Sequence, residues 1–273
     1  MDLQRILDYL QEQRRLDFSG YCRAMVERRL ETRMRAVHCD TEAAYLAYLE
    51  QHAQELDCLV DALAINVSSF FRNPLTFEYL AQEILPVLIW EKQRRGDLCL
   101  RVWSAGCADG EEPYSVAILI DHLLKKEDTE FQVNIFATDI NEGAIQRAHL
   151  GEYALESLKH IKFGLFQAYF TKHNNTYCIS KAIKQLVQFS QQDLLHPLAH
   201  APSESVFGDF DIVLCRNVLI YLESQAQDSV FRKLHRSLAD RGCLVLGEAE
   251  TPVSENRGYF SPMRDACHIF QKT

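Results

Sequence analysis

The chain has 273 residues, 47% of them hydrophobic and 25% charged, which is the composition of a globular protein with one or two domains. Its formal net charge of −9 argues against general nucleic-acid binding, which requires a basic footprint, so no nucleic-acid partner is expected. Nine scattered cysteines without a C-x-x-C pair, and no apolar leader or run of about 18 apolar residues, predict a cytoplasmic protein with reduced thiols and no membrane insertion.

The first part of the chain is typical of a bundle of helices. Apolar residues recur at helical spacing over 3–10 and again over 45–63, and no strand pattern interrupts them. A middle helix is expected over 19–37, with one apolar side. We therefore expect a small all-α domain over residues 1–64, whose middle helix also carries Arg23, Arg28, Arg29, Arg33 and Arg35.

From about residue 74, short apolar runs alternate with helical patterns. Helices are expected over 76–93, 113–126 and 225–238, and buried strands over 98–104, 131–138, 210–215 and 243–247. This alternation predicts an α/β domain over 65–273 with a mostly parallel sheet and right-handed crossovers. Two further runs, 176–180 and 186–190, look like a strand pair in a small β excursion within about 155–190.

The loop after the first strand of this domain has the features of a ligand site. Open α/β sheets bind ligands at the carboxyl ends of their strands, and Gly106 and Gly110 allow the backbone to approach a ligand closely. The spacing is not the dinucleotide fingerprint, and Glu111 and Glu112 would repel a pyrophosphate, so a cationic ligand such as S-adenosylmethionine fits better. The alternative is a tight turn whose acids stabilise the helix dipole.

Polar residues also follow the next two strands. Asp139 ends one strand and is suited to accept hydrogen bonds from ribose hydroxyls, although Asp139 or Asn141 would equally serve as a helix N-cap. Arg216 and Asn217 follow the next strand, with Tyr221 about one turn later. Asn217 would hydrogen-bond the ligand and Tyr221 would orient a reacting group. The alternative is a salt-bridged Arg216 and a packed Tyr221.

Four segments taken together resemble the chemotaxis-receptor glutamate methyltransferase family (CheR type). The order and spacing fit over nearly the whole chain. The segments are INVSSFFRN at 65–73, VWSAGCADGEEPYS at 102–115, FATDI at 136–140 and FDIVLCRNVLIY at 210–221. Taken alone, the two phenylalanines of the first segment would only pack a linker onto the sheet.

The resemblance implies a Rossmann-like S-adenosylmethionine-dependent methyltransferase domain behind a small all-α domain. Its activity would be methyl transfer to glutamate carboxylates of methyl-accepting chemotaxis proteins, with S-adenosylhomocysteine as the product. Arg72 and Tyr221 would flank the methyl group, and Asp193 stands where the family commonly has Asn. The implied cofactor-binding residues are Asn66, Ser68, Arg72, Gly106, Glu111, Asp139, Asp193, Leu194, Arg216, Asn217 and Val218.

The chemistry agrees with this set of residues. A glutamate side chain, with a pKa of about 4.3, is already ionised near pH 7, so alignment and exclusion of water matter more than a general base. No metal is expected, because the ten histidines show no paired ligand spacing.

The resemblance also implies a partner, the acidic methylation helices of chemoreceptor cytoplasmic domains. The candidates for docking are Arg28, Arg29, Arg33 and Arg35, and the alternative is a solvated helix face with a Glu31–Arg35 pair. Family members that tether to a receptor pentapeptide carry a glycine in a loop of the β excursion. The stretch 171–177 has none, so a pentapeptide-independent enzyme is expected.

Three other functions compete with this prediction. One is a different S-adenosylmethionine enzyme on the same fold, acting on a small molecule or another protein. Another is a non-catalytic regulator that binds S-adenosylmethionine or S-adenosylhomocysteine, which the presence of both Arg72 and Tyr221 disfavours. A nicotinamide dehydrogenase comes last, because the glycine loop is acidic and lacks the fingerprint.

Overall fold

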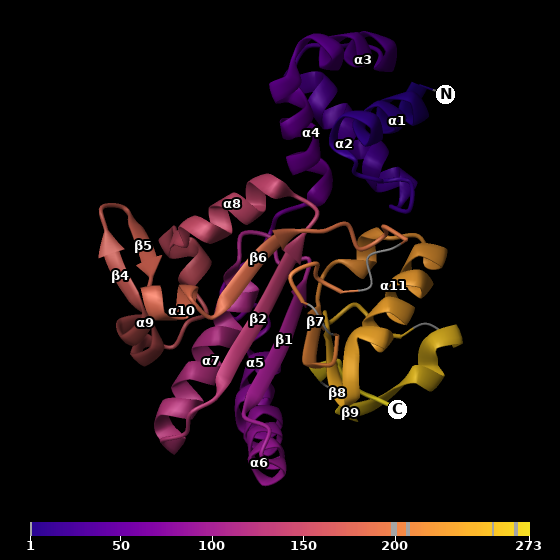
Figure 1. Ribbon diagram of the computed structural model, residues 1–273. Helices are drawn as coiled ribbons and strands as arrows, with labels where there is room; N and C mark the ends of the chain where they lie inside the picture. The colour runs from indigo at the N-terminus through magenta and orange to yellow at the C-terminus, as the bar shows by residue number, and fades with distance from the viewer. Residues whose placement is uncertain (1, 198–200, 206–207, 253, 265–266) are drawn as a thin grey trace.

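The computed structural model describes residues 2–197, 201–205, 208–252, 254–264 and 267–273. Four helices form the N-terminal domain, at the top of Figure 1: α1 (Asp2–Arg14), α2 (Arg23–Ala36), α3 (Glu42–Gln51) and α4 (Ala53–Ala64). They enclose a hydrophobic core of their own, in which Ile6, Leu10 and Tyr45 are fully buried. Helix α2 begins at Arg23, later than expected, because the residues before it pair with another loop, as described below.

Seven strands form the main sheet, in the order β6-β2-β1-β7-β8-β10-β9. Their bounds are β1 (Cys99–Ala105), β2 (Gln132–Asp139), β6 (Val187–Gln191), β7 (Phe210–Cys215), β8 (Leu238–Leu246), β9 (Phe260–Arg264) and β10 (Ile269–Lys272). The first five strands of that order are parallel, and β10 is antiparallel to both of its neighbours. The carboxyl ends of β1, β2 and β7 therefore open at one edge, which lies below the helical domain (Figure 1).

Helices cover both faces of the main sheet, and β1 contributes to both cores. Leu100 and Val102 pack with α5, α6 and α7, whereas Trp103 and Ala105 pack with α11 on the other face. A π-helical turn, Leu80–Ile84, joins α5 to α6 within the single helix expected there. The helices are α5 (Pro74–Tyr79), α6 (Leu85–Arg95), α7 (Glu111–Glu127), α8 (Glu142–Leu150), α9 (Phe163–Tyr169), α10 (Lys181–Lys184) and α11 (Ser224–Ser237). Short 3-10 turns occupy Leu155–Leu158, Leu219–Tyr221 and Ser254–Tyr259.

A separate three-stranded antiparallel sheet forms the β excursion, in the order β3-β5-β4. Its strands are β3 (Glu152–Tyr153), β4 (Phe170–His173) and β5 (Thr176–Ile179). The expected pairing of 176–180 with 186–190 is wrong, because β5 pairs with β3 and β4, while β6 pairs in parallel with β2 at the edge of the main sheet. A hydrophobic pattern identifies a strand, but its partner depends on distant contacts. The predicted architecture, an α/β domain with a mostly parallel sheet behind a small all-α domain, is confirmed.

Candidate active site

A cleft lies between the helical domain and the carboxyl edge of the main sheet. It holds about 860 Å³ of space not filled by atoms, open solvent included. Most of the predicted site residues line it: Ser68, Arg72, Gly106, Asp139, Leu194, Arg216, Asn217, Val218 and Tyr221. Asn66, Glu111 and Asp193 lie outside this lining.

The loop after β1 is tied to the end of β2 and has no room for a larger residue. Gly106 N donates to Thr138 O at 2.7 Å, and Ala108 N donates to Asp139 Oδ2 at 2.8 Å. Gly106 has φ of 80°, and a Cβ there would collide with the Val218 side chain. Glycine therefore lets this backbone turn pass beside the post-β7 segment and border the cleft.

Asp139 is shared between the loop and the next helix. Its other oxygen accepts from Asn141 N at 2.9 Å, while Asn141 itself is the N-cap of α8 and accepts from Gly143 N and Ala144 N. The capping role considered for this segment thus belongs to Asn141, which leaves Asp139 at the cleft wall. Burial raises the pKa of Asp139 to about 6.

Glu111 stands at the first turn of α7 and is 4% exposed. Burial raises its pKa to about 7, although hydrogen bonds from the Ser68 and Ser157 hydroxyls favour the charged form. One carboxylate oxygen is buried without a hydrogen-bond partner among the described residues. Because Ser68 lines the cleft beside it, this unsatisfied acceptor suits a cationic ligand group.

Arg216 uses its guanidinium to fasten the interdomain linker to the sheet. Its side chain is 2% exposed and pairs with Glu112 at 3.1 Å. It also donates to Arg72 O at 2.9 Å and to Asn73 Oδ1 at 2.8 Å, and it lies over the Phe77 ring. Arg216 is therefore salt-bridged, as the alternative interpretation of the sequence expected. It also lines the cleft.

The linker is buried on one side and strained. Phe70 and Phe71 are buried, as the packing alternative expected, and their N–H groups donate to Ser157 O and to Ser115 Oγ. Between them and α5, Arg72 is half-buried and lines the cleft. Left-handed backbone occurs at Ile65, Phe71 and Asn73, with φ of 53°, 53° and 62°. Such strain in non-glycine residues is concentrated at functional sites.

The segment after β7 is held by an acid that sequence reasoning missed. The buried carboxylate of Glu250 accepts hydrogen bonds from five backbone N–H groups. The donors are Asn217, Val218, Leu219, Ile220 and Gly247, at 2.8, 2.9, 2.8, 3.3 and 2.7 Å. Glu250 follows β8, the strand beside β7. In the sequence, this position after a strand of the same sheet edge was the one feature that could have pointed to its role.

A second missed residue, Tyr21, closes the cleft from the helical domain. Its side chain lines the cleft and its backbone bridges Leu222. Cys22 N donates to Tyr221 O at 2.8 Å, and Glu223 N donates to Gly20 O at 2.9 Å. The loop that enters α2 is thus hydrogen-bonded to the loop that carries Tyr221.

Two of the three predicted residues outside the cleft lining, Asp193 and Asn66, have local hydrogen-bond partners. Asp193 Oδ1 accepts from Leu195 N at 2.7 Å, and Asn66 Nδ2 donates weakly to Asp61 Oδ1 at 3.5 Å. Leu194, next to Asp193, does line the cleft, and its carbonyl accepts from Lys233 Nζ at 2.6 Å.

Comparison with known protein families identifies the cofactor. The model described as "CheR methyltransferase, SAM binding domain" matches residues 66–268, and "CheR methyltransferase, all-alpha domain" matches 1–64. The chain belongs to the CheR methyltransferase family. The predicted family, the S-adenosylmethionine cofactor and the methyltransferase class are therefore confirmed.

Curated relatives are similar in sequence to this CheR methyltransferase over most of its length. Chemotaxis protein methyltransferase 2 of Vibrio cholerae is 30% identical over 254 residues, covering 92% of this chain and 85% of that protein. The chemotaxis protein methyltransferase of Salmonella typhimurium is 31% identical, with 90% and 82% covered. An uncharacterized 104.1 kDa protein of Rhodobacter capsulatus is 33% identical, but the chain spans only 25% of it. No helix in the described part of the chain is long and apolar enough to cross a bilayer.

Proposed function

We propose that this CheR methyltransferase transfers the methyl group of S-adenosylmethionine to glutamate side chains on the cytoplasmic domains of chemotaxis receptors. The products are glutamate methyl ester and S-adenosylhomocysteine. The main support is the cleft, which is lined by Arg72 and Tyr221 together with Asp139 and the glycine loop. Relatives named chemotaxis protein methyltransferases cover most of the chain, which supports the same function.

In this proposal each wall of the cleft has one task toward the cofactor. Asp139 accepts the ribose hydroxyls, Glu111 attracts a cationic group, and Leu194 packs beside the adenine. Gly106 and the 217–218 backbone shape the floor, which Glu250 holds in place. When bound, S-adenosylmethionine supplies an electrophilic methyl carbon on a positively charged sulfur.

The protein aligns a nucleophile that is already ionised. The bound cofactor would supply its methyl group to a carboxylate oxygen of the receptor, with S-adenosylhomocysteine as the leaving group, and Arg72 and Tyr221 would hold that oxygen in line. The negative charge of the carboxylate and the positive charge of the sulfonium cancel, and no proton moves. Arg72 orients the incoming carboxylate and Tyr221 shapes the site, so the rate enhancement comes from orientation and exclusion of water.

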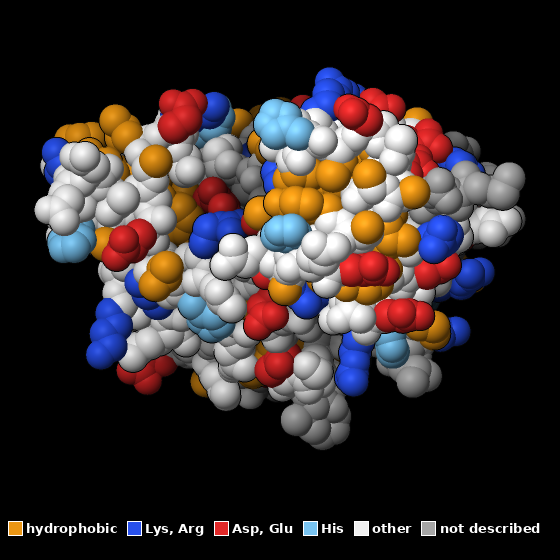
Figure 2. Space-filling model, turned by 90° about the horizontal axis from the view of Figure 1, so that it is seen from above, with side chains coloured by type: hydrophobic (Ala, Val, Ile, Leu, Met, Phe, Trp, Pro, Cys, Tyr) orange, Lys and Arg blue, Asp and Glu red, His pale blue; other side chains and the backbone are white. Residues whose placement is uncertain are grey.

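The basic helix α2 is proposed as the receptor-docking element. Arg33 is held by a bidentate pair with Glu55, at 2.9 and 2.7 Å, and Glu55 also accepts from Tyr45. Arg35 has only an exposed pair with Glu31, and Arg28 is exposed with no ion pair among the described residues. Seen from above, the molecule shows basic, acidic and hydrophobic side chains intermixed (Figure 2). We therefore propose that Arg28, Arg29 and Arg35 meet acidic helices, while Arg33 secures α2.

We also propose that the enzyme does not depend on a receptor pentapeptide. A two-residue turn without glycine joins β4 to β5, and Asn174 within it takes φ of 54°. Calorimetric titration with a receptor C-terminal pentapeptide should show no binding in the micromolar range. A micromolar dissociation constant would overturn this part of the proposal.

The central test is transfer of label from S-adenosylmethionine to a receptor cytoplasmic domain, read as base-labile methyl ester. Arg72→Ala should abolish transfer and leave the far-ultraviolet circular dichroism spectrum unchanged. Arg232→Ala, which removes an exposed arginine of α11, serves as the control and should retain full activity. Cofactor binding by the unaltered protein without any transfer would favour the non-catalytic regulator.

A further inference from the structure

The small sheet carries three metal-ligating side chains on its solvent face. Glu152 on β3 pairs directly with Cys178 on β5, and Thr171 on β4 pairs with Cys178 from the other side. His173 lies two residues further along β4, and side chains two apart in a strand point to the same face. Tyr153, one residue after Glu152, is buried in the main core. The sheet thus buries Tyr153 on one face and carries Glu152, Cys178 and His173 on the other.

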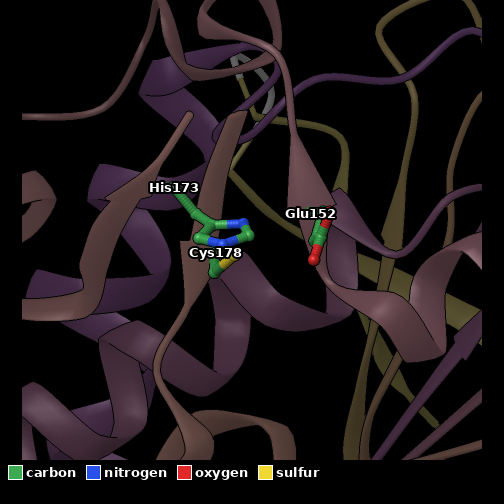
Figure 3. A group of neighbouring side chains, drawn as sticks. All are labelled: Glu152, His173 and Cys178. Carbon is green, nitrogen blue, oxygen red and sulfur yellow. The ribbon is translucent and has the colours of Figure 1, made fainter. Parts of the chain in front are cut away.

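The three donor atoms converge closely enough for one ion. A carboxylate oxygen of Glu152, a ring nitrogen of His173 and Sγ of Cys178 all lie within 4.8 Å of one another. Figure 3 shows the imidazole beside the thiol, with the carboxylate across from them. Three atoms no more than 4.8 Å apart always have a point within about 2.8 Å of all of them, so inward shifts of about 0.5–0.8 Å reach ordinary zinc–ligand distances of about 2.0–2.3 Å. Small side-chain rotations on a fixed sheet provide such shifts.

We propose that Glu152, His173 and Cys178 form a binding site for one divalent transition-metal ion of the zinc class. A set of one sulfur, one nitrogen and one oxygen donor suits zinc and disfavours magnesium or calcium, which prefer oxygen alone. Thiolate and carboxylate together neutralise the two charges of the ion. Three protein ligands leave the fourth tetrahedral position to water.

A bound ion would brace the part of the sheet that is held least. Strand β3 has only two residues, and Tyr153 within it donates from its hydroxyl to Asp109 O, in the glycine loop, at 2.8 Å. An ion that joins Glu152 to β4 and β5 closes this short strand onto its neighbours. The site lies outside the cleft and takes no part in methyl transfer, so its test is independent of the proposed function.

Cobalt titration of the full chain, stripped of metal and kept reduced with a phosphine, tests the site. We expect a thiolate-to-cobalt charge-transfer band that saturates at one ion per chain and is displaced by zinc. Zinc should also raise the melting temperature. Cys178→Ser should abolish the band, and Glu152→Gln and His173→Ala should each weaken cobalt binding by at least about tenfold.

The control is Cys58→Ser, which removes an exposed thiol outside the cluster and should leave the titration unchanged. The site is refuted if the unaltered chain shows no saturable band. A band that survives Cys178→Ser, or that disappears with Cys58→Ser, would equally overturn the proposal, because the ion would then bind elsewhere.

Discussion

The cleft edge of the α/β domain and the basic face of α2 are built in opposite ways. At the cleft, charged groups are buried and multiply bonded: Arg216 is 2% exposed on its side chain, and Glu250 accepts five N–H groups. On α2, the side chains of Arg23 and Arg35 are 73% and 75% exposed and pair only with neighbours four residues away. The proposed cofactor site therefore depends on fixed positions, whereas the proposed docking surface depends on charge that tolerates motion and screening.

The largest effect should come from the acid beneath the post-β7 segment. Glu250→Ala leaves five N–H groups without their charged acceptor, so we expect the free energy of unfolding to fall by about 4 kcal/mol or more, with loss of cofactor binding. Urea denaturation and calorimetry with S-adenosylhomocysteine measure both quantities. Glu248→Ala, an exposed neighbour, is the control. Equal stability of the two variants would contradict the anchoring role.

The next largest effect should distinguish the arginine of α2 that stabilises the helical domain from those proposed to contact the receptor. Arg33→Ala leaves Glu55, which is 6% exposed, without its cation, and should lower the free energy of unfolding by about 2–3 kcal/mol. Arg28→Ala should leave stability unchanged, because Arg28 is exposed. Thermal unfolding of both variants makes the comparison. If Arg33→Ala were as stable as Arg28→Ala, Arg33 would belong to the docking surface alone.

The pH dependence of cofactor binding tests the buried acids. Glu111 has a pKa raised to about 7 by burial, and its ionised form attracts the cation, so affinity for S-adenosylmethionine should rise by up to about tenfold from pH 6 to 8. The free protein should become less stable as pH rises from 4.5 to about 7, because folded Glu111 retains a proton that the unfolded chain has released. Glu111→Gln should reduce the slope of both profiles, while Asp139, whose pKa burial raises to about 6, keeps its own contribution. Unchanged profiles would remove Glu111 from the site.

The smallest effect concerns the exposed charges. Arg28→Glu should raise the KM for a receptor domain several-fold at low salt and leave the affinity for S-adenosylhomocysteine unchanged. Adding salt should reduce the difference from the unaltered enzyme. A KM independent of both the substitution and the salt would place receptor docking on another surface.

The sequence predicted the cleft well because strand ends share an edge. Gly106, Asp139 and Asn217 each follow a buried strand, so parallel pairing alone brings them together. It did not predict the partner of β6, which is chosen by contacts with β2 more than 40 residues away. Nor did it predict Glu250, whose role exists only once two neighbouring loops lie side by side.

The strip of backbone bonds between residues 20–22 and 221–223 limits how the two domains can be recombined. A chimera that takes its helical domain from a relative and joins it at the linker would replace one side of this strip. The transplanted loop must match the host in length between its first helix and α2, or Cys22 will not reach Tyr221. The unit of exchange is thus the four helices together with the 216–223 loop, because a graft of the helices alone would break the backbone hydrogen bonds that join Gly20 and Cys22 to the loop of Tyr221.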